Sequence, residues 1–294
     1  MVKKTHNIKA SKKRSFFSEM WRNYKKNPSA MVGLIIIVVI VVVAIIAQFV
    51  FDYNEDIVRQ NMKERLQHPS KEHIMGTDQY GRDVFIRVLY GAKYSLSVGI
   101  VSVAISCLIG STMGLIAGYY GGVVENIILR FAEIFMGIPS VLLGIAIMSA
   151  FGQSLFVLML AIGLVYVPMF ARTARAAVLP VRDEEYIEAA RVSGVSDLKI
   201  IATHILPNSL SPIIVQVTMG VANGILTASH LSFLGLGVPV PAPEWGAMLS
   251  GGRDFIRDYS YLTLYPGIAI MLTVLSFNLM GDGLRDAMDP KLKQ

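Results

Sequence analysis

A chain of 294 residues is long enough for one large domain or two small ones, so its composition has to decide the class of protein. Hydrophobic residues make up 53% of the chain and charged residues only 16%, which is more apolar surface than a water-soluble core needs. The net charge of +6 does not indicate a nucleic-acid partner, because the basic excess lies mainly in residues 1–27. The single cysteine, Cys107, excludes an intrachain disulfide. We therefore predict an all-α polytopic membrane protein.

The N-terminal segment has the pattern of a basic flank followed by a membrane helix. Residues 1–27 carry nine Lys/Arg and one acidic residue, Glu19, which is typical of the cytoplasmic side of a span. Residues 28–51 carry no charge, and at about 1.5 Å per residue they reach roughly 36 Å, enough to cross a hydrocarbon core of about 30 Å. This run is longer than the apolar part of a signal peptide, so we predict a retained first transmembrane helix.

The remaining uncharged runs predict a total of six transmembrane helices, at residues 28–51, 94–118, 126–150, 154–172, 210–231 and 261–281. An even number of spans places the tails 1–27 and 285–294 on the same, cytoplasmic side. Arg130 and Glu133 lie one turn apart in the third predicted span and are close enough to pair, although charges at the membrane interface are the favoured interpretation.

Two long segments connect these spans. Residues 52–93 are predicted to form an extracytoplasmic loop, whose part 83–92 is expected to be an interfacial helix. Residues 94–284 are predicted to form a five-helix core that includes a cytoplasmic loop at 173–209. The basic residues of that cytoplasmic loop agree with the excess of Lys/Arg found on the inner side of membrane proteins.

Several kinds of chemistry are not indicated. No G-x-x-x-x-G-K-[ST], H-E-x-x-H or G-x-S-x-G motif occurs, so a P-loop and the commonest protease and hydrolase sites are not predicted. His68 and His73 are not flanked by a carboxylate-rich shell, and no metal site is expected. The spans are almost bare of the ionisable residues that couple transport to protons or sodium. This pattern favours an external energy source.

The cytoplasmic loop 173–209 has the pattern of helix, turn and helix. Acidic residues 183–185 fit the first turn of a helix, where the positive end of the helix dipole favours them. Gly194 fits the position just after the helix end, because glycine adopts the left-handed conformation at little cost. Ser196 is expected to cap a second short helix, which Pro207 closes. On this pattern alone, the loop is equally well an ordinary amphipathic connector or a surface that another protein approaches closely.

The stretch EAARVSGVSDLKIIATHILPN resembles the EAA loop of ABC importer permeases, which has the form EAA-x3-G-x9-I-x-L-P. Six residues match this motif: Glu188, Ala189, Ala190, Gly194, Leu206 and Pro207. His204 replaces the isoleucine, as in the HILPN ending of the peptide/nickel branch. The stretches MGTDQYGRDVFIRVLYGAKYSLSVG, LSFLGLGVPVPAPEWGAML and YPGIAIMLTVLSFNLMGDGLRDAMDPKLK fit the same branch. One departure is Ala228, where the branch often has glutamate.

The resemblance implies a type I ABC importer permease fold and a set of partners. These are a homologous second permease, two cytoplasmic ATPase subunits that bind ATP and Mg²⁺, and an extracytoplasmic solute-binding protein. This chain itself would lie in a bacterial cytoplasmic (inner) membrane, in contact with lipid, and would be neither an enzyme nor a cofactor-binding protein. The short helix of the loop would be a coupling helix seated in the ATPase, with Glu188 as a contact and Gly194 as its shaping turn. The substitution Gly194→Asp is then expected to abolish uptake without abolishing membrane insertion.

The resemblance favours peptides as the substrate, with nickel or another small solute carried by the same machine as the alternative and a secondary transporter as the less favoured class. Four residues share one face of the fifth span at i, i+4, i+7 and i+11 and are candidates to line the substrate path: Gln216, Gly220, Asn223 and Thr227. Small and amide residues also favour close helix packing in lipid, which is the preferred of the two interpretations. Residues 235–243 are expected to form an outer loop, with Trp245 at the membrane interface.

Overall fold

The computed structural model describes residues 16–288, and the chain is almost entirely helical over that range. The helices are α1 (Phe16–Tyr24), α2 (Pro28–Val50), α3 (Val84–Tyr120), α4 (Gly122–Met136), α5 (Ser140–Phe151), α6 (Leu155–Arg182), α7 (Glu185–Val192), α8 (Asp197–Ile200), α9 (Leu206–Phe233), α10 (Trp245–Gly252) and α11 (Tyr261–Met288). Short π or 3-10 segments are η1 (Tyr53–Val58), η2 (Met62–Glu64), η3 (Ile201–Ile205) and η4 (Arg253–Phe255). Most of the predicted basic N-terminal tail and the last six residues lie outside the described range.

Five helices are long and apolar enough to cross a membrane: α2, α3, α6, the continuous helix Asp197–Phe233 that contains α9, and α11. The pair α4 and α5 passes the same test together but is bent by 86° at its break. The prediction of a single helix at 126–150 is therefore wrong, whereas the predicted total of six spans holds if the bent pair counts as one span. The break falls at Pro139, which cannot donate a backbone hydrogen bond and clashes with the preceding turn of a helix. With 15 residues, α4 reaches only about 22 Å.

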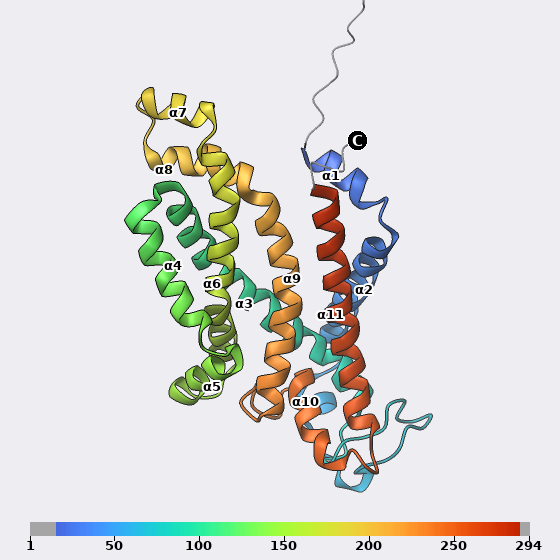
Figure 1. The fold of residues 1–294 in the computed structure, drawn as a ribbon. Helices are drawn as coiled ribbons and strands as arrows, with labels where there is room; N and C mark the ends of the chain where they lie inside the picture. Colours follow the sequence, from blue (N-terminus) through green and yellow to red (C-terminus); the bar gives the residue numbers. More distant parts are fainter. Residues whose placement is uncertain (1–15, 289–294) are drawn as a thin grey trace, which may run out of the picture.

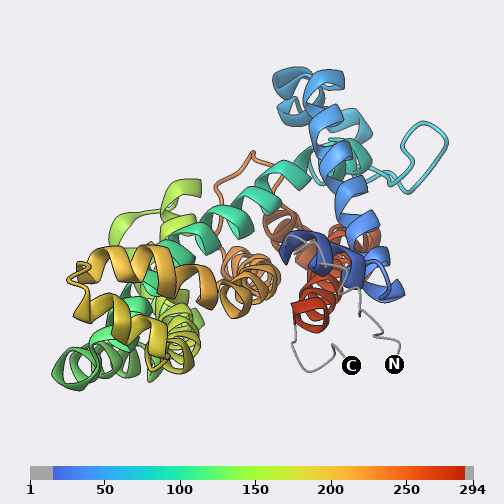
Figure 2. The ribbon, with the colours of Figure 1, turned by 90° about the horizontal axis from the view of Figure 1, so that it is seen from above.

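The two ends of the molecule carry different elements. Figure 1 shows α1, α7, α8 and the end of α11 at one end, and α5, α10 and the loop between α2 and α3 at the other. Seen along the bundle, α3 crosses the molecule obliquely (Figure 2). On one side of α3 lies a group of helices formed by α4, α5, α6, α7 and α8. At its other end lies a second group formed by α1, α2 and α11, and α9 lies between the two groups. Both ends of the described chain thus lie on the same side as the α7–α8 segment.

Helix α3 starts earlier than predicted. It begins at Val84, where the Asp83 side chain accepts a hydrogen bond from the Ile86 N–H at 3.1 Å and caps the helix. The expected interfacial helix at 83–92 and the expected span at 94–118 are one helix, so the domain boundary at residue 93 falls inside α3. The sequence suggested an interfacial segment because it carries charges, but one of them, Arg87, is only 3% exposed. Helices α6 and α11 also extend beyond their predicted ends, to Arg182 and Met288.

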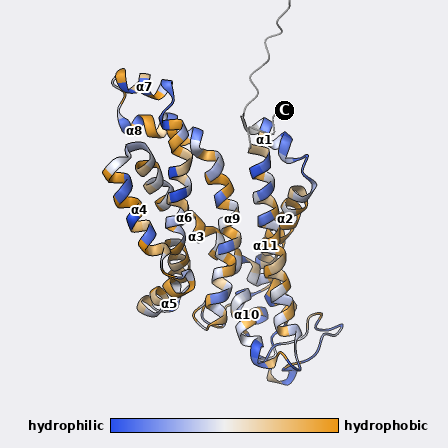
Figure 3. Ribbon diagram, in the orientation of Figure 1, coloured by the Kyte–Doolittle hydropathy of each residue, from blue (hydrophilic) through white to orange (hydrophobic). Residues whose placement is uncertain are grey.

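Apolar surface covers the outside of α2. Its exposed large side chains are Val32, Ile35, Val38, Val39, Val42, Ile45, Ile46, Phe49 and Val50. The hydropathy colouring of Figure 3 shows the same apolar character along this helix. An exposed helix face without polar side chains over this length is the face that lipid solvates.

Small residues bring α3 and α6 into direct backbone contact. A Cβ atom at Gly110 would lie 2.4 Å from the Val167 carbonyl oxygen, and one at Gly114 would lie 2.2 Å from the Ala171 carbonyl oxygen. The Ser106 hydroxyl donates across the same interface to a carbonyl oxygen of α6 at 2.7 Å. Close backbone approach and interhelical hydrogen bonds are what hold membrane helices together.

We expect Gly114→Ala to lower the apparent melting temperature of the detergent-solubilised protein, because the added methyl group forces α3 away from α6. Overpacking of this kind costs about 1–3 kcal/mol. Gly137→Ala is the matched control, since its added Cβ would come no closer than 3.4 Å to the atoms around it. Thermal unfolding measured by fluorescence compares the two variants, and equal melting temperatures would contradict this account of the interface.

Candidate coupling site and transport path

The α7–α8 unit, residues 185–200, extends beyond the ends of α3 and α6 (Figure 1). Helix α7 begins after Glu184 and carries Glu185 and Glu188 in its first turn, where acidic side chains are stabilised by the helix dipole. Of the predicted acidic residues 183–185, only Glu185 lies in this first turn, because Glu184 is the N-cap residue and Asp183 caps the end of α6. The sequence therefore placed the helix correctly to within two residues.

Gly194 ends α7 in a left-handed conformation, with φ +76°. Its N–H donates to the Arg191 carbonyl oxygen at 3.0 Å, and the Val195 N–H donates to the Ala190 carbonyl oxygen at 3.1 Å. This pair of bonds is the Schellman motif, and the predicted glycine cap is confirmed. A Cβ atom at this position would meet no atom within 4 Å, so the requirement for glycine is conformational and not steric.

Apolar side chains fasten the inner side of the unit to the helices below it. Ile187, Ile200 and Ile205 are fully buried, in one cluster with Leu115 of α3 and Val178 of α6. Burying each such side chain stabilises the packing by about 1.5–3 kcal/mol. The α7–α8 unit is therefore a rigid extension of α3 and α6.

A polar contact adds to this attachment. The Tyr119 hydroxyl at the end of α3 donates to the Asp197 carboxylate at 2.7 Å, and the Arg191 guanidinium lies 4.8 Å above the Tyr119 ring. The Arg191 Nε–H also donates to the Tyr119 oxygen at 3.3 Å. One aromatic side chain thus links α7, α8 and α3.

The outer side of the unit exposes large apolar side chains without a partner in residues 16–288. Val192 is 90% exposed and Leu198 is 78% exposed. The six residues of the EAA motif divide between the two sides: Ala190 and Leu206 pack inward, whereas Glu188, Ala189, Gly194 and Pro207 are exposed.

Pro207 does not close the unit, contrary to the prediction. Residues Asp197–Phe233 form one continuous helix, in which the π segment Ile201–Ile205 precedes the proline. The Leu206 N–H donates to the Ile201 carbonyl oxygen, five residues back. This wider turn accommodates a residue whose ring would clash with a regular helix. Ser196 takes the predicted N-cap position, but its side chain makes no capping hydrogen bond.

The four polar or small residues predicted on one face of α9 have different surroundings. Gly220 lies against α3 and α6, and a Cβ atom there would be 3.2 Å from Val103. The Thr227 hydroxyl is 2.8 Å from the Tyr166 hydroxyl, which also donates to the Asn223 carbonyl oxygen at 3.3 Å. These three residues are thus involved in packing α9 onto its neighbours.

Gln216, the fourth member, lines a cavity between α6, α9 and α11. Its Nε2 atom is buried and has no hydrogen-bond partner in the described part of the chain. Of the four predicted residues it is therefore the one with a buried polar atom that lacks a hydrogen-bond partner in residues 16–288.

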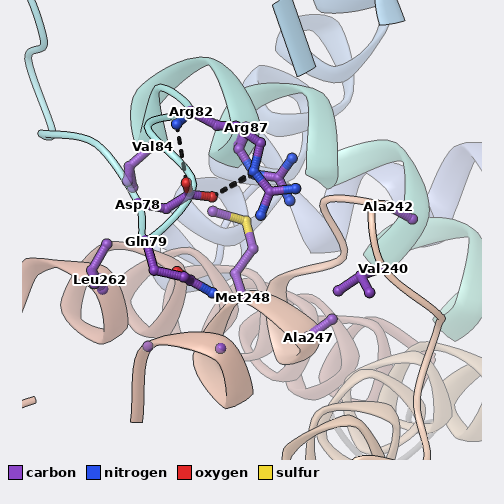
Figure 4. Close-up of a pocket in the computed structure, with 12 residues that line it drawn as sticks. Asp78, Gln79, Arg82, Val84, Arg87, Val240, Ala242, Ala247, Met248 and Leu262 are labelled. Atoms are coloured by element: carbon purple, nitrogen blue, oxygen red, sulfur yellow. Dashed lines mark hydrogen bonds and ion pairs between the residues drawn. The ribbon is translucent and has the colours of Figure 1, made fainter. Parts of the chain in front are cut away.

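A buried charge cluster at the other end of the molecule was not predicted. Figure 4 shows Asp78, Arg82 and Arg87 beside a small pocket that α10 and the start of α11 also line. The Arg82 Nε–H donates to the Asp78 carboxylate at 2.7 Å, and the Arg87 Nε lies 3.7 Å from the same carboxylate. Arg87 also donates to the carbonyl oxygens of Ile57 at 2.6 Å and Pro241 at 3.2 Å. The cluster therefore joins the loop between α2 and α3, helix α3 itself and the segment before α10.

Trp245 is another correction, because it is only 2% exposed and is therefore buried within the protein instead of anchoring in the lipid headgroups. Its indole N–H donates to the Val88 carbonyl oxygen at 2.9 Å. The preceding Glu244 is 1% exposed, caps α10 and accepts hydrogen bonds from Ser95 and Ser232. Glutamate is not among the residues that favour the N-cap position, so the sequence carried no clear signal for this cap.

His73 lies close to two carboxylates, contrary to what its sequence neighbours suggested. Its Nδ1 is 2.8 Å from Asp83 and its Nε2 is 3.7 Å from Glu64. The two carboxylates contact different nitrogens on opposite sides of the imidazole ring, so they do not converge on a single position where a metal ion could bind. Over residues 16–288 no group of three or more His, Cys, Asp or Glu side chains is arranged to hold a metal ion.

This geometry defines a class of protein: a multi-pass membrane protein with a rigid helical unit extending from one end. Residues 110–294 match the sequence model of a family described as binding-protein-dependent transport system inner membrane component, and residues 15–69 match the N-terminal TM domain of oligopeptide transport permease C. The chain belongs to the family of binding-protein-dependent transport permeases. It is a transmembrane permease component of an ABC importer.

Curated relatives cover nearly the whole chain. The dipeptide transport system permease protein DppC of Alkalihalophilus pseudofirmus is 49% identical, over 94% of this chain and 90% of the relative. The protein of the same name from Haemophilus influenzae is 42% identical, over 94% and 95%. The glutathione transport system permease protein GsiD of Pectobacterium atrosepticum is 41% identical, over 95% and 93%.

A solved structure shows the same fold. A chain of the MetNI methionine ABC transporter in an inward-facing conformation superposes with a TM-score of 0.57, at 18% sequence identity. In that crystal form the match covers 69% of this chain and 96% of the other. The predicted type I ABC importer permease fold is confirmed.

Proposed function

We propose that this chain imports peptides across the bacterial cytoplasmic membrane as one permease subunit of an ATP-driven, binding-protein-dependent importer. The names of the dipeptide and glutathione transport relatives support the choice of peptides over nickel or another small solute. The near-absence of charged residues from the spans supports an energy source outside the chain.

The proposed assembly contains a homologous second permease, two ATPase subunits and a solute-binding protein on the outer side. ATP and Mg²⁺ bind to the ATPase subunits, and this chain is non-catalytic. The side that carries α1, α7 and the end of α11 faces the cytoplasm, because the basic flank of α2 belongs there. Both termini are then cytoplasmic.

The α7–α8 unit is the proposed contact with an ATPase subunit. One observation carries this proposal: two large apolar side chains, Val192 and Leu198, are exposed on a unit that is otherwise firmly packed. Exposed apolar side chains rimmed by charged ones mark protein interaction sites. Because Ile187 and Ile200 lock the unit to α3 and α6, movement of the ATPase is passed on to those helices.

The substitutions Val192→Asp and Leu198→Asp test this assignment. We expect each to reduce co-purification of the ATPase subunits at least about tenfold, since each apolar side chain buried at the interface contributes about 1.5–3 kcal/mol. Met62→Asp, at a residue 58% exposed in the outer loop, is the control that leaves ATPase binding unchanged. Retention of the ATPase subunits by both loop variants would show that they bind elsewhere.

Uptake by the reconstituted complex tests the substrate. We expect ATP-dependent import of a radiolabelled dipeptide in the presence of the binding protein. Import of nickel chelates without import of dipeptides would establish the alternative substrate, and transport without ATP would refute the proposed energy source.

A further inference from the structure

A cavity of about 740 Å³ opens between α6, α9 and α11, on the side of the molecule that carries the α7–α8 unit. Its polar lining residues come from all three helices: Thr173, Asn208, Ser211, Gln216 and Arg285. Its volume lies within the range of roughly 300–1,000 Å³ that small-molecule sites occupy. The cavity is therefore large enough for a short peptide.

Two side chains of this cavity, Gln216 and Arg285, carry N–H donors that have no oxygen acceptor in residues 16–288. The Gln216 Nε2 atom has no acceptor within residues 16–288. Arg285 is exposed and forms no ion pair within residues 16–288, and its guanidinium donates only to the weakly accepting sulfur of Met219 there, at 3.6 Å. The Asn208 amide, by contrast, already donates to the His204 carbonyl oxygen at 2.7 Å. A ligand that satisfies the two free donors must supply acceptors, and a carboxylate is the best match for a guanidinium.

The other large cavity of the molecule has different chemistry. It measures about 780 Å³, lies toward the opposite end between α9 and α11, and is lined by no Asp, Glu, Lys or Arg. The two helices touch between the cavities, where a Cβ atom at Gly281 would be 3.0 Å from Met219. Of these two cavities, the one beside the α7–α8 unit is therefore the one that offers a charged side chain to a ligand.

We propose that this cavity binds the peptide on the cytoplasmic half of its path, with Arg285 holding the C-terminal carboxylate and the Gln216 amide donating to a peptide carbonyl oxygen. This assignment rests on the proposed function and adds the substrate contacts to it. Two walls of the cavity, from α6 and α9, are the helices that lead into and out of the α7–α8 unit. Displacement of that unit therefore changes the shape of the peptide site.

Thiol labelling tests the site directly, because the chain contains a single cysteine. In a Cys107→Ser background, Ser211→Cys places a thiol on the cavity wall, and Ala202→Cys places one on an exposed part of η3 outside it. The assembled permease and ATPase complex is placed in phosphatidylcholine nanodiscs without ATP and without binding protein. Labelling of this chain by a water-soluble maleimide is followed with dialanine or with dialanine amide.

We expect dialanine to slow labelling at residue 211 at least about fivefold and the amide to have little effect, with no change at residue 202. Gln216→Leu is expected to raise the protecting concentration about tenfold. Arg285→Gln should abolish the preference for the free carboxylate, and Arg285→Lys should restore it. A residue with a purely structural role would not alter that preference.

Unprotected labelling in a complex that imports dialanine would overturn this site while leaving the proposed function intact. If dialanine is neither imported nor protects residue 211 from labelling, both the proposed function and the proposed peptide site are wrong. Protection that appears only when an anionic lipid is added to the nanodiscs, with or without dialanine, would assign the cavity to a lipid headgroup and refute the peptide site.

Discussion

Gly194→Asp is expected to abolish peptide uptake while the chain still inserts into the membrane and assembles with the second permease. The substitution adds a negative charge to an exposed surface that already carries Glu188, at the proposed ATPase contact. It does not disturb the core, because a side chain at this position meets no atom within 4 Å of its Cβ. Uptake in reconstituted vesicles and ATPase co-purification are the two measurements.

Two further substitutions separate charge from backbone conformation. Gly194→Asn has nearly the shape of the aspartate variant without its charge, and asparagine tolerates the left-handed conformation. We expect it to retain most of the uptake. Gly194→Val is expected to fail, because a β-branched residue at φ +76° destabilises the Schellman turn by about 1–2 kcal/mol or more. Full uptake by the valine variant would show that the shape of this turn is not required.

Asp78→Asn is expected to produce the largest loss of stability among the substitutions considered. It keeps the side-chain oxygen that accepts from the backbone of Tyr80 and Arg82 but removes the negative charge beside two buried guanidinium groups. Breaking a buried charge pair costs about 3–5 kcal/mol, because the remaining charge is left uncompensated. Thermal unfolding in detergent should therefore shift strongly to lower temperature.

An exposed ion pair provides the control for this substitution. Arg130 and Glu133 pair at 3.0 Å with side chains 81% and 56% exposed, so Glu133→Gln should cost less than about 1 kcal/mol. Adding Arg82→Met to Asp78→Asn should recover part of the lost stability, because it removes the excess positive charge. Equal melting temperatures for Asp78→Asn and Glu133→Gln would refute the role of the cluster.

Hydropathy and short motifs predicted most of the fold, and the errors have identifiable causes. The bend within residues 126–150 was not predicted, because the length of an uncharged run carries no information about the direction of the helix axis. Pro139, at the bend, was the local signal for it. The charges of residues 83–92 suggested a surface position, but Arg87 is compensated by Asp78, a partner in a separate segment of the chain. The prediction for Trp245 used the average preference of tryptophan for membrane interfaces, but in this chain the indole N–H donates to the Val88 carbonyl oxygen inside the protein.

In the candidate sites, too, features set by neighbouring residues were predictable and features set by tertiary packing were not. The turn at Gly194 depends on local backbone conformation and was predictable from neighbouring residues. The distinction between Gln216 and Thr227 was not, because it depends on what α6 and α11 place opposite each of them. Whether two residues share a helix face follows from their spacing in the sequence. Whether a donor lacks an acceptor depends on how the helices pack around it.

The continuity of Asp197–Phe233 has a mechanical consequence. This helix crosses α3 at Gly224, where a Cβ atom would lie 3.5 Å from the Cα of Gly99, and the crossing divides it unequally. At about 1.5 Å per residue, the arm toward Asp197 is about 40 Å long and the arm toward Phe233 about 14 Å. A tilt about the crossing makes the helix a lever with a ratio of about three to one. A large displacement of the Asp197 end then becomes a small displacement of the Phe233 end.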